Sequence, residues 1–315
     1  MKKLISILIP AYNEQEVLDM LYERLGKLAH ENQNYHFEFL FVNDGSRDST
    51  LEIIEGFAEK DSRVSYINLS RNFGKEIAMC AGFDFVKGDA MVIIDADLQD
   101  PPELIPQMIA YWEQGYDDVF ARRRSRAGET WFKKTTSTWY YRILQKSTRI
   151  PIQVDTGDFR LLDRRCIEAL KQFRESERYT KGMFSWIGYK KKEILYDRDP
   201  RAAGEIQQTL SKLVGLAIDG ITSFTIAPLR ISSFVGAIIS LFAFVYIIYL
   251  LIRPLFGVPT VPGYASTMAV ILFMGGVQLL SIGIIGEYVG RIFNETKNRP
   301  LYLVEHYHES ADGKK

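Results

Sequence analysis

An acidic cluster follows a short apolar run in the middle of the chain. Residues 90–94 are apolar, and the next positions supply carboxylate and amide side chains, namely Asp95, Asp97, Gln99 and Asp100. If the apolar run is a strand, Asp95 and Asp97 project together from its carboxyl end, because side chains two positions apart point the same way. Two carboxylates this close repel each other unless a cation lies between them. The pair therefore indicates either a site for Mg²⁺ or Mn²⁺ shared with a substrate's phosphates, or a solvated acidic turn.

The elements that must position this cluster alternate between strand and helix patterns. The expected order begins and ends with a strand, over residues 4–10, 14–29, 37–43, 49–60, 64–69, 76–87 and 90–94. This order predicts a Rossmann-like α/β fold, with a mostly parallel sheet covered by helices and ligands outside the strands' carboxyl ends. Polar residues follow all four strands, at positions 12–14, 44–45, 71–75 and 95–100. Four convergent strand ends favour one crevice, and therefore the metal site over the acidic turn.

Several functional classes are disfavoured by the sequence. Gly74 and Lys75 lack the earlier glycine of a phosphate-binding loop, and no Gly-x-Gly-x-x-Gly follows the first expected strand. A P-loop ATPase and a nicotinamide enzyme are therefore not expected. Lys plus Arg and Asp plus Glu both number 39, so charge gives no indication of nucleic acid as a partner. Cys80 and Cys166 fit a reducing compartment and form no metal-binding spacing.

The last third of the chain contains two long apolar segments. Residues 231–252 carry no charged side chain, and this length can cross a hydrocarbon core of about 30 Å. Residues 257–286 are also uncharged, so we expect a second span at about 265–287 and an antiparallel transmembrane hairpin over 230–290. Positive residues flank this hairpin, at Arg230, Arg291, Lys297 and Arg299, whereas the loop offers Arg253. The positive-inside rule then predicts a multi-pass protein of the cell membrane with its catalytic domain and both termini in the cytoplasm.

Two further segments have amphipathic patterns. Residues 129–146 mix basic and aromatic side chains, which predicts a helix at the membrane interface or a solvated basic helix. Residues 206–229 carry an apolar stripe and lead into the first span, so this helix either packs on the catalytic domain or lies on lipid. The expected organisation is a catalytic domain over 1–205, a juxtamembrane helix over 206–229, the hairpin, and a cytoplasmic tail over 291–315.

Four ordered motifs resemble those of family 2 glycosyltransferases with the GT-A fold. They are Ile-Pro-Ala-Tyr-Asn-Glu at 9–14, Val-Asn-Asp-Gly-Ser-Arg-Asp-Ser-Thr at 42–50, Asp-Ala-Asp-Leu-Gln-Asp-Pro-Pro at 95–102 and Gly-Asp-Phe-Arg-Leu-Leu at 157–162. More narrowly, the chain resembles polyprenyl-phosphate glycosyltransferases, relatives of dolichyl-phosphate mannose synthase. The hairpin and its flanking residues 219–224 and 286–291 are similar to the bacterial subgroup that makes undecaprenyl-phosphate glucose.

The resemblance implies roles for individual residues. A UDP-sugar would be held by the following nucleotide-binding residues: Pro10, Ala11, Tyr12, Glu14, Asp44, Lys75 and Asp95. Asp97 and Gln99, with Asp95 nearby, would ligate the Mg²⁺ or Mn²⁺ that bridges the diphosphate. Asp158 matches the family's catalytic aspartate, and Arg160 would act beside it. The family inverts configuration at the anomeric carbon.

The chemistry of the acceptor limits the work left for Asp158. A phosphate monoester has a second pKa near 6, so a polyprenyl phosphate is largely a dianion at neutral pH and needs little activation. We therefore expect Asp158 to orient Arg160 or the acceptor, or to remove a proton from the monoanion alone. Arginine forks bind phosphate in two-point geometry, so the lipid phosphate is expected at a basic run formed by Arg122, Arg123 and Arg124.

One departure from the family pattern concerns the acceptor phosphate. Relatives usually carry Gly-Glu-Ser-Lys-aromatic where this chain has Gly-Glu-Ile-Gln-Gln at 204–208. The lysine that would help to hold phosphate there is absent, and Arg201 is the candidate substitute.

The expected function is inverting, metal-dependent transfer of a sugar, with glucose as the first candidate, from a UDP-sugar to polyprenyl phosphate at the cytoplasmic membrane face. N-acetylglucosamine, mannose or an aminosugar are the alternatives. A processive polysaccharide synthase is disfavoured, because no tryptophan lies in a Gln-x-x-Arg-Trp run. A non-catalytic membrane subunit of a lipid-sugar export system is the alternative from another class, and it would require an oligomer. The spacing of Gly286 and Gly290 permits close helix packing in a homo-oligomer.

Overall fold

The computed structural model describes residues 2–124, 156–176, 178–197, 227–252 and 263–310. The chain divides into two compact units, one formed by residues 1–214 with 300–315 and the other by residues 215–299. The interfacial helix expected over 129–146 lies outside the described residues. So do Arg201 and nearly all of the juxtamembrane segment 206–229.

The first unit is built on one eight-stranded sheet in the order β7-β5-β6-β4-β1-β2-β3-β8. Its strands are β1 (Leu4–Ala11), β2 (His36–Asn43), β3 (Val64–Leu69), β4 (Ala90–Ile93), β5 (Asp118–Arg123), β6 (Thr156–Asp163), β7 (Lys191–Tyr196) and β8 (Val304–His308). The central strands β4, β1, β2 and β3 pair in parallel, and β5 pairs in parallel with β7. Antiparallel pairs join β6 to β4 and β5, and β8 to β3. The expected α/β class with a mostly parallel sheet is confirmed.

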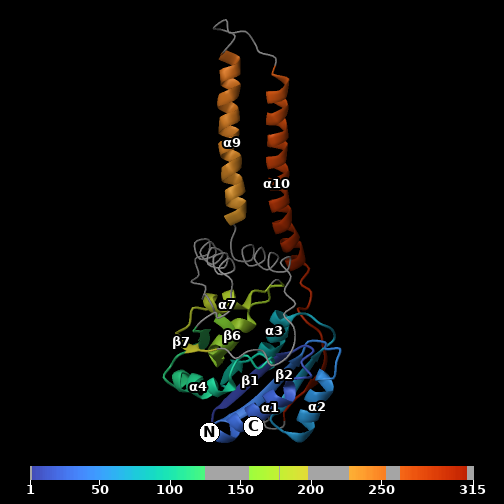
Figure 1. Cartoon of the computed structure of the whole chain (residues 1–315), viewed down its shortest axis with the longest axis vertical. Helices are drawn as coiled ribbons and strands as arrows, with labels where there is room; N and C mark the ends of the chain where they lie inside the picture. The colour runs from blue at the N-terminus through green and yellow to red at the C-terminus, as the bar shows by residue number, and fades with distance from the viewer. Residues whose placement is uncertain (1, 125–155, 177, 198–226, 253–262, 311–315) are drawn as a thin grey trace. The chain divides into compact units, whose positions relative to one another are not determined.

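Helices cover both faces of this sheet (Figure 1). On one face lie α1 (Leu18–Glu31), α2 (Thr50–Lys60), the short η1 (Pro102–Leu104) and α4 (Ile105–Glu113). On the other lie α3 (Lys75–Phe85), α6 (Arg164–Lys171) and α7 (Thr180–Trp186). Because strand side chains alternate, Ile7 and Ile9 of β1 enter the first core and Leu8 enters the second. This two-sided burial explains why the central strands are continuous apolar runs.

The elements expected over residues 4–94 are all present, and the largest difference is at the start of α1. This helix begins at Leu18, whereas the sequence pattern placed its start at residue 14. The intervening backbone is hydrogen-bonded to the loop after β2. Asn13 N donates to Ser46 Oγ at 3.0 Å, and Glu14 N donates to Thr50 Oγ1 at 2.9 Å. These bonds keep residues 13–14 out of the helix and join two neighbouring loops at the carboxyl edge of the sheet.

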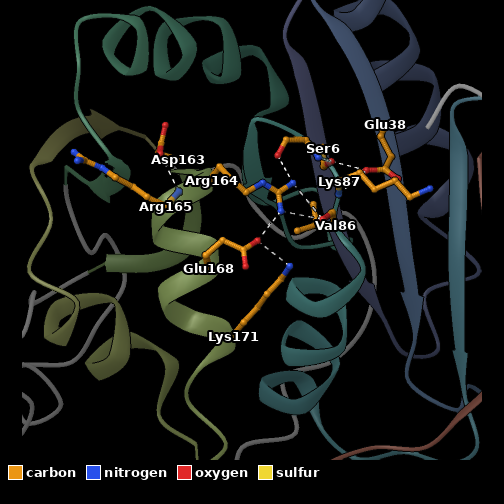
Figure 2. A network of polar contacts seen from close by, with 10 residues as sticks. Ser6, Glu38, Val86, Lys87, Asp163, Arg164, Arg165, Glu168 and Lys171 are labelled. Atoms are coloured by element: carbon orange, nitrogen blue, oxygen red, sulfur yellow. Dashed lines mark hydrogen bonds and ion pairs between the residues drawn. The ribbon is translucent and has the colours of Figure 1, made fainter. Parts of the chain in front are cut away.

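A polar network fixes the opposite, amino-terminal edge of the sheet (Figure 2). The buried Glu38 carboxylate accepts hydrogen bonds from Ser6 Oγ at 2.5 Å and Ser65 Oγ at 3.0 Å. Nearby, Arg164 donates to the carbonyl of Val86 at 3.2 Å and pairs with Glu168 at 3.1 Å. The polar groups of this network are hydrogen-bonded to one another. We therefore assign a structural role to this edge and look for the reactive residues at the carboxyl edge.

The C-terminal segment returns to the sheet as β8, a strand that no sequence pattern predicted in the tail. Asn68 Nδ2 donates to Glu305 Oε2 at 3.0 Å, and Tyr66 stacks on His308 with ring centroids 5.4 Å apart. The chain therefore leaves the first unit, forms the second, and re-enters the first. Both ends of the second unit connect to the same body.

The second unit contains two long helices, α9 (Ala227–Ile252) and α10 (Tyr264–Thr296). Large apolar side chains are exposed on both, including Phe242 at 72% and Leu279 at 73%. Among the residues that the structure describes, Phe273–Thr296 has the length and hydropathy of a membrane span, whereas the apolar part of α9, Ser232–Tyr246, is shorter. Ser232 Oγ donates to Ser281 Oγ at 2.8 Å between the helices.

A close backbone approach at Gly45 gives a testable consequence of this fold. Gly45 has a φ of +63°, and a Cβ there would meet the Arg71 carbonyl carbon and lie 2.5 Å from Asn72 N. We expect Gly45→Ala to lower the free energy of unfolding by about 1–3 kcal/mol, because strained φ and backbone overlap combine. Gly26→Ala, within α1 and with no atom within 4 Å, is the control and should stabilise by up to about 1 kcal/mol. Urea unfolding of the detergent-purified chain measures both, and equal tolerance of the two substitutions would contradict this description.

Candidate active site

The polar residues at the carboxyl edge of the sheet are joined by hydrogen bonds into one site. Asn13, after β1, accepts from Arg47 N at 2.9 Å, which links the first two loops. Asp44, after β2, accepts from backbone N–H groups before α3. Lys75, at the start of α3, reaches both Asp95 after β4 and Asp158 on β6. The polar residues that follow the expected strands are therefore brought together by direct contacts.

Lys75 occupies the centre of this arrangement. Its Nζ lies 2.6 Å from Asp95 Oδ1 and 2.6 Å from Asp158 Oδ2. Its side chain is 42% exposed along its length, but the ammonium is bound on two sides. Burial alone would lower the pKa of Lys75, and the two carboxylates outweigh it and raise that pKa above its usual value. Lys75 is therefore a fixed positive charge.

Asp158 is held as a carboxylate. Burial opposes its ionisation, but the positive charges of Lys75, Lys181 and Arg160 outweigh burial and lower the pKa of Asp158 to about 2. Its Oδ2 accepts from Lys75, whereas Oδ1 is buried and has no hydrogen-bond partner among the described residues. A buried oxygen in this state is able to accept a donor from a ligand.

The acidic cluster lies in a turn. We expected Asp95 and Asp97 to point the same way because they would continue a strand. That reason was wrong, because β4 ends at Ile93. Burial still alternates through the turn: the intervening Ala96 and Leu98 are buried, and Asp95, Asp97 and Gln99 are partly exposed. Leu98 has a φ of +60°, which is strained for a bulky residue, and its side chain is anchored in the core. The turn is thus held in shape by the core beneath it.

The donor atoms in this turn fit a cation that takes few ligands from the protein. The described residues contain no group of three or more His, Cys, Asp or Glu side chains placed to hold a metal. Asp97 Oδ1 accepts from Gln99 N at 3.1 Å, and Asp95 shares its charge with Lys75. Mg²⁺ bound by one or two carboxylates keeps several waters and takes its other ligands from substrate phosphates. The oxygen set of Asp95, Asp97 and Gln99 is compatible with such a site.

Apart from Lys75 and Asp95, the expected nucleotide-binding residues lie at the ends of β1 and β2. Pro10 and Ala11 are buried at the end of β1, and Tyr12 is 40% exposed beyond it. Asp44 is buried, and burial raises its pKa although its oxygens accept from Phe73 N at 2.7 Å and Gly74 N at 2.9 Å. Asp44 therefore anchors the loop that carries Lys75, and each of its oxygens keeps a further lone pair for a ligand.

Arg160 is enclosed in the protein. Its side chain is 1% exposed, its Nη1 lies 3.1 Å from Asp118 Oδ2, and its guanidinium carbon lies 3.8 Å from the Phe184 ring centroid. A second bond runs from Nη2 to the Gly157 carbonyl at 3.3 Å. In this position the positive charge of Arg160 stabilises the Asp158 carboxylate. Its buried bonds also hold β6, the strand that carries Asp158, in place.

The three arginines of residues 122–124 have separate surroundings. Arg122 pairs with Glu193 at 2.9 Å, and Arg124 lies 3.7 Å from Asp197. Arg123 lies beside Tyr196 and, as the next residue of the strand, faces the opposite side of the sheet from Arg122. These residues therefore do not converge on one point in the described structure.

Comparison with known proteins assigns the family. The model for glycosyl transferase family 2 matches residues 6–171, and that for the GtrB C-terminal hairpin matches residues 227–292. The chain belongs to glycosyl transferase family 2. It is thus a glycosyltransferase, as the four motifs indicated. The hairpin match covers most of α9 and α10 and accords with the two-helix arrangement.

Three relatives extend along nearly the whole glycosyltransferase. An uncharacterized glycosyltransferase of Synechocystis is 47% identical, covering 95% of this chain and 94% of the relative. The bactoprenol glucosyl transferase of Shigella phage SfII is 41% identical, with coverages of 96% and 98%. The prophage bactoprenol glucosyl transferase homolog of Escherichia coli is 40% identical, also with coverages of 96% and 98%.

The glycosyltransferase site also contains residues that sequence reasoning missed. Glu76 Oε2 accepts from Thr180 N at 2.9 Å and from the Thr180 hydroxyl. Burial and the nearby Asp158 charge raise the pKa of Glu76 to about 7. Asp118 and Lys181 likewise act on Arg160 and Asp158. The contact between Glu76 and Thr180 could not be predicted from the sequence, because the two residues are 104 positions apart. The charged pair of Lys75 and Glu76 after a glycine was the one local pattern that pointed to this part of the site.

The raised pKa of Glu76 predicts a particular pH dependence of stability. The unfolded chain loses this proton near pH 4.5 and the folded chain near pH 7, so the folded state binds more protons between these values and stability falls as pH rises. We expect Glu76→Gln to remove this decline, so that the variant gains stability relative to wild type between about pH 5 and 7 and gains no more above about pH 8. Urea unfolding across this range measures the difference. The control Glu16→Gln, at an exposed position, should follow wild type, and a Glu76→Gln curve parallel to wild type would contradict the prediction.

Proposed function

We propose that this glycosyltransferase moves a sugar, with glucose as the first candidate, from a UDP-sugar to a polyprenyl phosphate such as undecaprenyl phosphate. The supporting observation is that one chain joins a family 2 catalytic unit to a GtrB-type hairpin, and that proteins named bactoprenol glucosyl transferase share this whole arrangement. An acceptor dissolved in a membrane explains why the catalytic unit carries an apolar hairpin. The acceptor phosphate oxygen would bond to the anomeric carbon from the face opposite the departing UDP, with inversion.

The donor would lie over the ends of β1, β2 and β4. In this proposal Pro10, Ala11, Tyr12, Glu14 and Asp44 surround the nucleoside, with Lys75 and Asp95 beside the phosphates. Asp97 and Gln99, with Asp95, would hold Mg²⁺ or Mn²⁺. When bound, the cation would neutralise charge that develops on the departing diphosphate. Lys75 would supply a second, permanent positive charge there, because its pKa is raised.

Asp158 would position groups and would not act as a general base. A carboxylate with a pKa of about 2 is a weak base, and the acceptor phosphate is already largely dianionic near neutral pH. Its ion pair with Lys75 and its unpartnered Oδ1 support a role in holding Lys75 and one further donor. Of the roles expected from the sequence, orientation is favoured, and the buried Arg160 would contribute by fixing β6.

The basic residues expected at the acceptor remain part of the proposal. Arg122, Arg123, Arg124 and Arg201 would attract the lipid phosphate to this side of the catalytic unit. The exposed pairs of Arg122 with Glu193 and Arg124 with Asp197 are weak enough to exchange for a phosphate. The Gly286 and Gly290 positions in α10 would permit a homo-oligomer.

A cytoplasmic catalytic unit is the proposed topology. Because β8 returns the chain to the catalytic sheet after α10, the segment between must cross a membrane an even number of times or not at all. Two crossings, by α9 and α10, agree with the hairpin match. Arg291, Lys297 and Arg299 after α10 then favour the cytoplasm for both termini. The rival export-subunit role would not explain why Lys75, Asp95 and Asp158 are held together at the carboxyl edge of the sheet.

A transfer assay tests this proposal. Membranes containing the chain should convert labelled UDP-glucose and polyprenyl phosphate into an organic-extractable, mild-acid-labile lipid. EDTA should stop the reaction, and Mg²⁺ or Mn²⁺ should restore it. Asp97→Asn should lower the rate by about 100-fold, as loss of an electrostatic contact at a leaving group does, whereas the exposed control Asp19→Asn should not.

The choice of donor separates the remaining alternatives. UDP-N-acetylglucosamine and GDP-mannose, tested in parallel, would reassign the sugar if either were preferred. Absence of labelled lipid with every donor would refute the proposed reaction and favour the non-catalytic role.

A further inference from the structure

The first turn of α7 is held next to Asp158 by the first turn of α3. Lys75 and Glu76 are consecutive residues there, and they bind different partners. Lys75 binds Asp158, and Glu76 accepts both the backbone N–H and the hydroxyl of Thr180, the first residue of α7. α7 also packs against β6, the strand that carries Asp158. This arrangement fixes the position of the residue that follows Thr180.

That residue, Lys181, carries a positive charge that is not bound by any hydrogen bond or ion pair among the described residues. Its side chain is partly buried, and its charge stabilises the carboxylates of both Asp158 and Glu76, which places it within electrostatic reach of them. The other cations around Asp158 are committed, because Lys75 is bound by two carboxylates and Arg160 pairs with Asp118. Within the described part of the chain, Lys181 makes no hydrogen bond or ion pair of its own.

Charge balance indicates what such a lysine would bind. In the proposed reaction, a diphosphate and a phosphate dianion meet beside Asp95 and Asp158, which are themselves negative. Lys75 offsets only part of this charge, and like charges that are not offset oppose binding. A lysine ammonium is a compact, mobile phosphate ligand. It also has three donors for the phosphate oxygens.

We propose that Lys181 binds a phosphate group of a substrate beside Asp158, and that Glu76 positions it through Thr180. This inference rests on the proposed function. The phosphate belongs either to the lipid acceptor or to the diphosphate of the donor, and the two sources share one chemistry. No motif of the sequence indicated a role for Lys181.

The full-length chain in detergent provides the test. We expect Lys181→Met to raise the dissociation constant of one substrate by at least about tenfold, the usual effect of losing one hydrogen bond to a charged group. If the Kd for polyprenyl phosphate rises while the Kd for UDP is unchanged, Lys181 binds the phosphate of the acceptor. If the Kd for UDP rises, measured by calorimetry, the donor is bound. Lys181→Arg should recover part of the loss, and Lys60→Met, at an exposed site at the end of α2, should change neither constant.

The position of Lys181 is tested through Glu76. Glu76→Ala should weaken binding of the same substrate as Lys181→Met does, whereas Glu76→Gln can still accept hydrogen bonds from Thr180 and should recover most of that loss. An unchanged Kd for UDP together with an unchanged affinity for polyprenyl phosphate in Lys181→Met would overturn the inference. Because both affinities are measurable without turnover, this result differs from failure of the proposed function, in which wild type forms no lipid-linked sugar.

Discussion

The ammonium of Lys75 between Asp95 and Asp158 is the interaction on which the active site depends. Asp95 belongs to the turn after β4, and Asp158 belongs to β6, which runs antiparallel to β4. Without a cation between them, the two carboxylates would repel each other at the point where two phosphate groups meet in the proposed reaction. Asp44 holds the loop before Lys75, and Gly45 allows that loop to come close. In the proposed reaction, the side chain of Lys75 would thus join the donor and acceptor sides of the site.

The rest of the fold holds the elements that carry Lys75, Asp95 and Asp158 in position. Leu98 anchors the strained turn in the core, and Arg160 fixes β6 by its buried pair with Asp118. The C-terminal strand β8 closes the free edge of β3, where Asn68 links Glu305 to Asn43, next to the Asp44 loop. A chain that carries a long apolar hairpin before its last strand therefore still completes one sheet. This return also gives the hairpin two attachments to the catalytic unit.

The sequence predicted the features that depend on local patterns. Apolar runs ending in polar residues located β1 to β4, and the four motifs located Asp44, Asp95 and Asp158. Contacts between distant segments gave no such signal, because Glu76 meets Thr180 across 104 positions and Asn68 meets Glu305 across 237. Two other differences have local causes. Hydrogen bonds to the neighbouring loop keep residues 13–14 out of α1, which begins at Leu18. A turn begins after Ile93, where the sequence pattern predicted one more strand residue.

A double-mutant cycle on Lys75 and Asp158 tests this central interaction most directly. Rates of sugar transfer would be measured, as kcat/KM, for wild type, Lys75→Met, Asp158→Asn and the double variant. We expect a coupling energy of at least about 1 kcal/mol, with Asp158→Asn lowering kcat/KM much less once Lys75 has been replaced. Effects that add to within about 0.5 kcal/mol would show that the two residues act independently, and would contradict the central role given to Lys75.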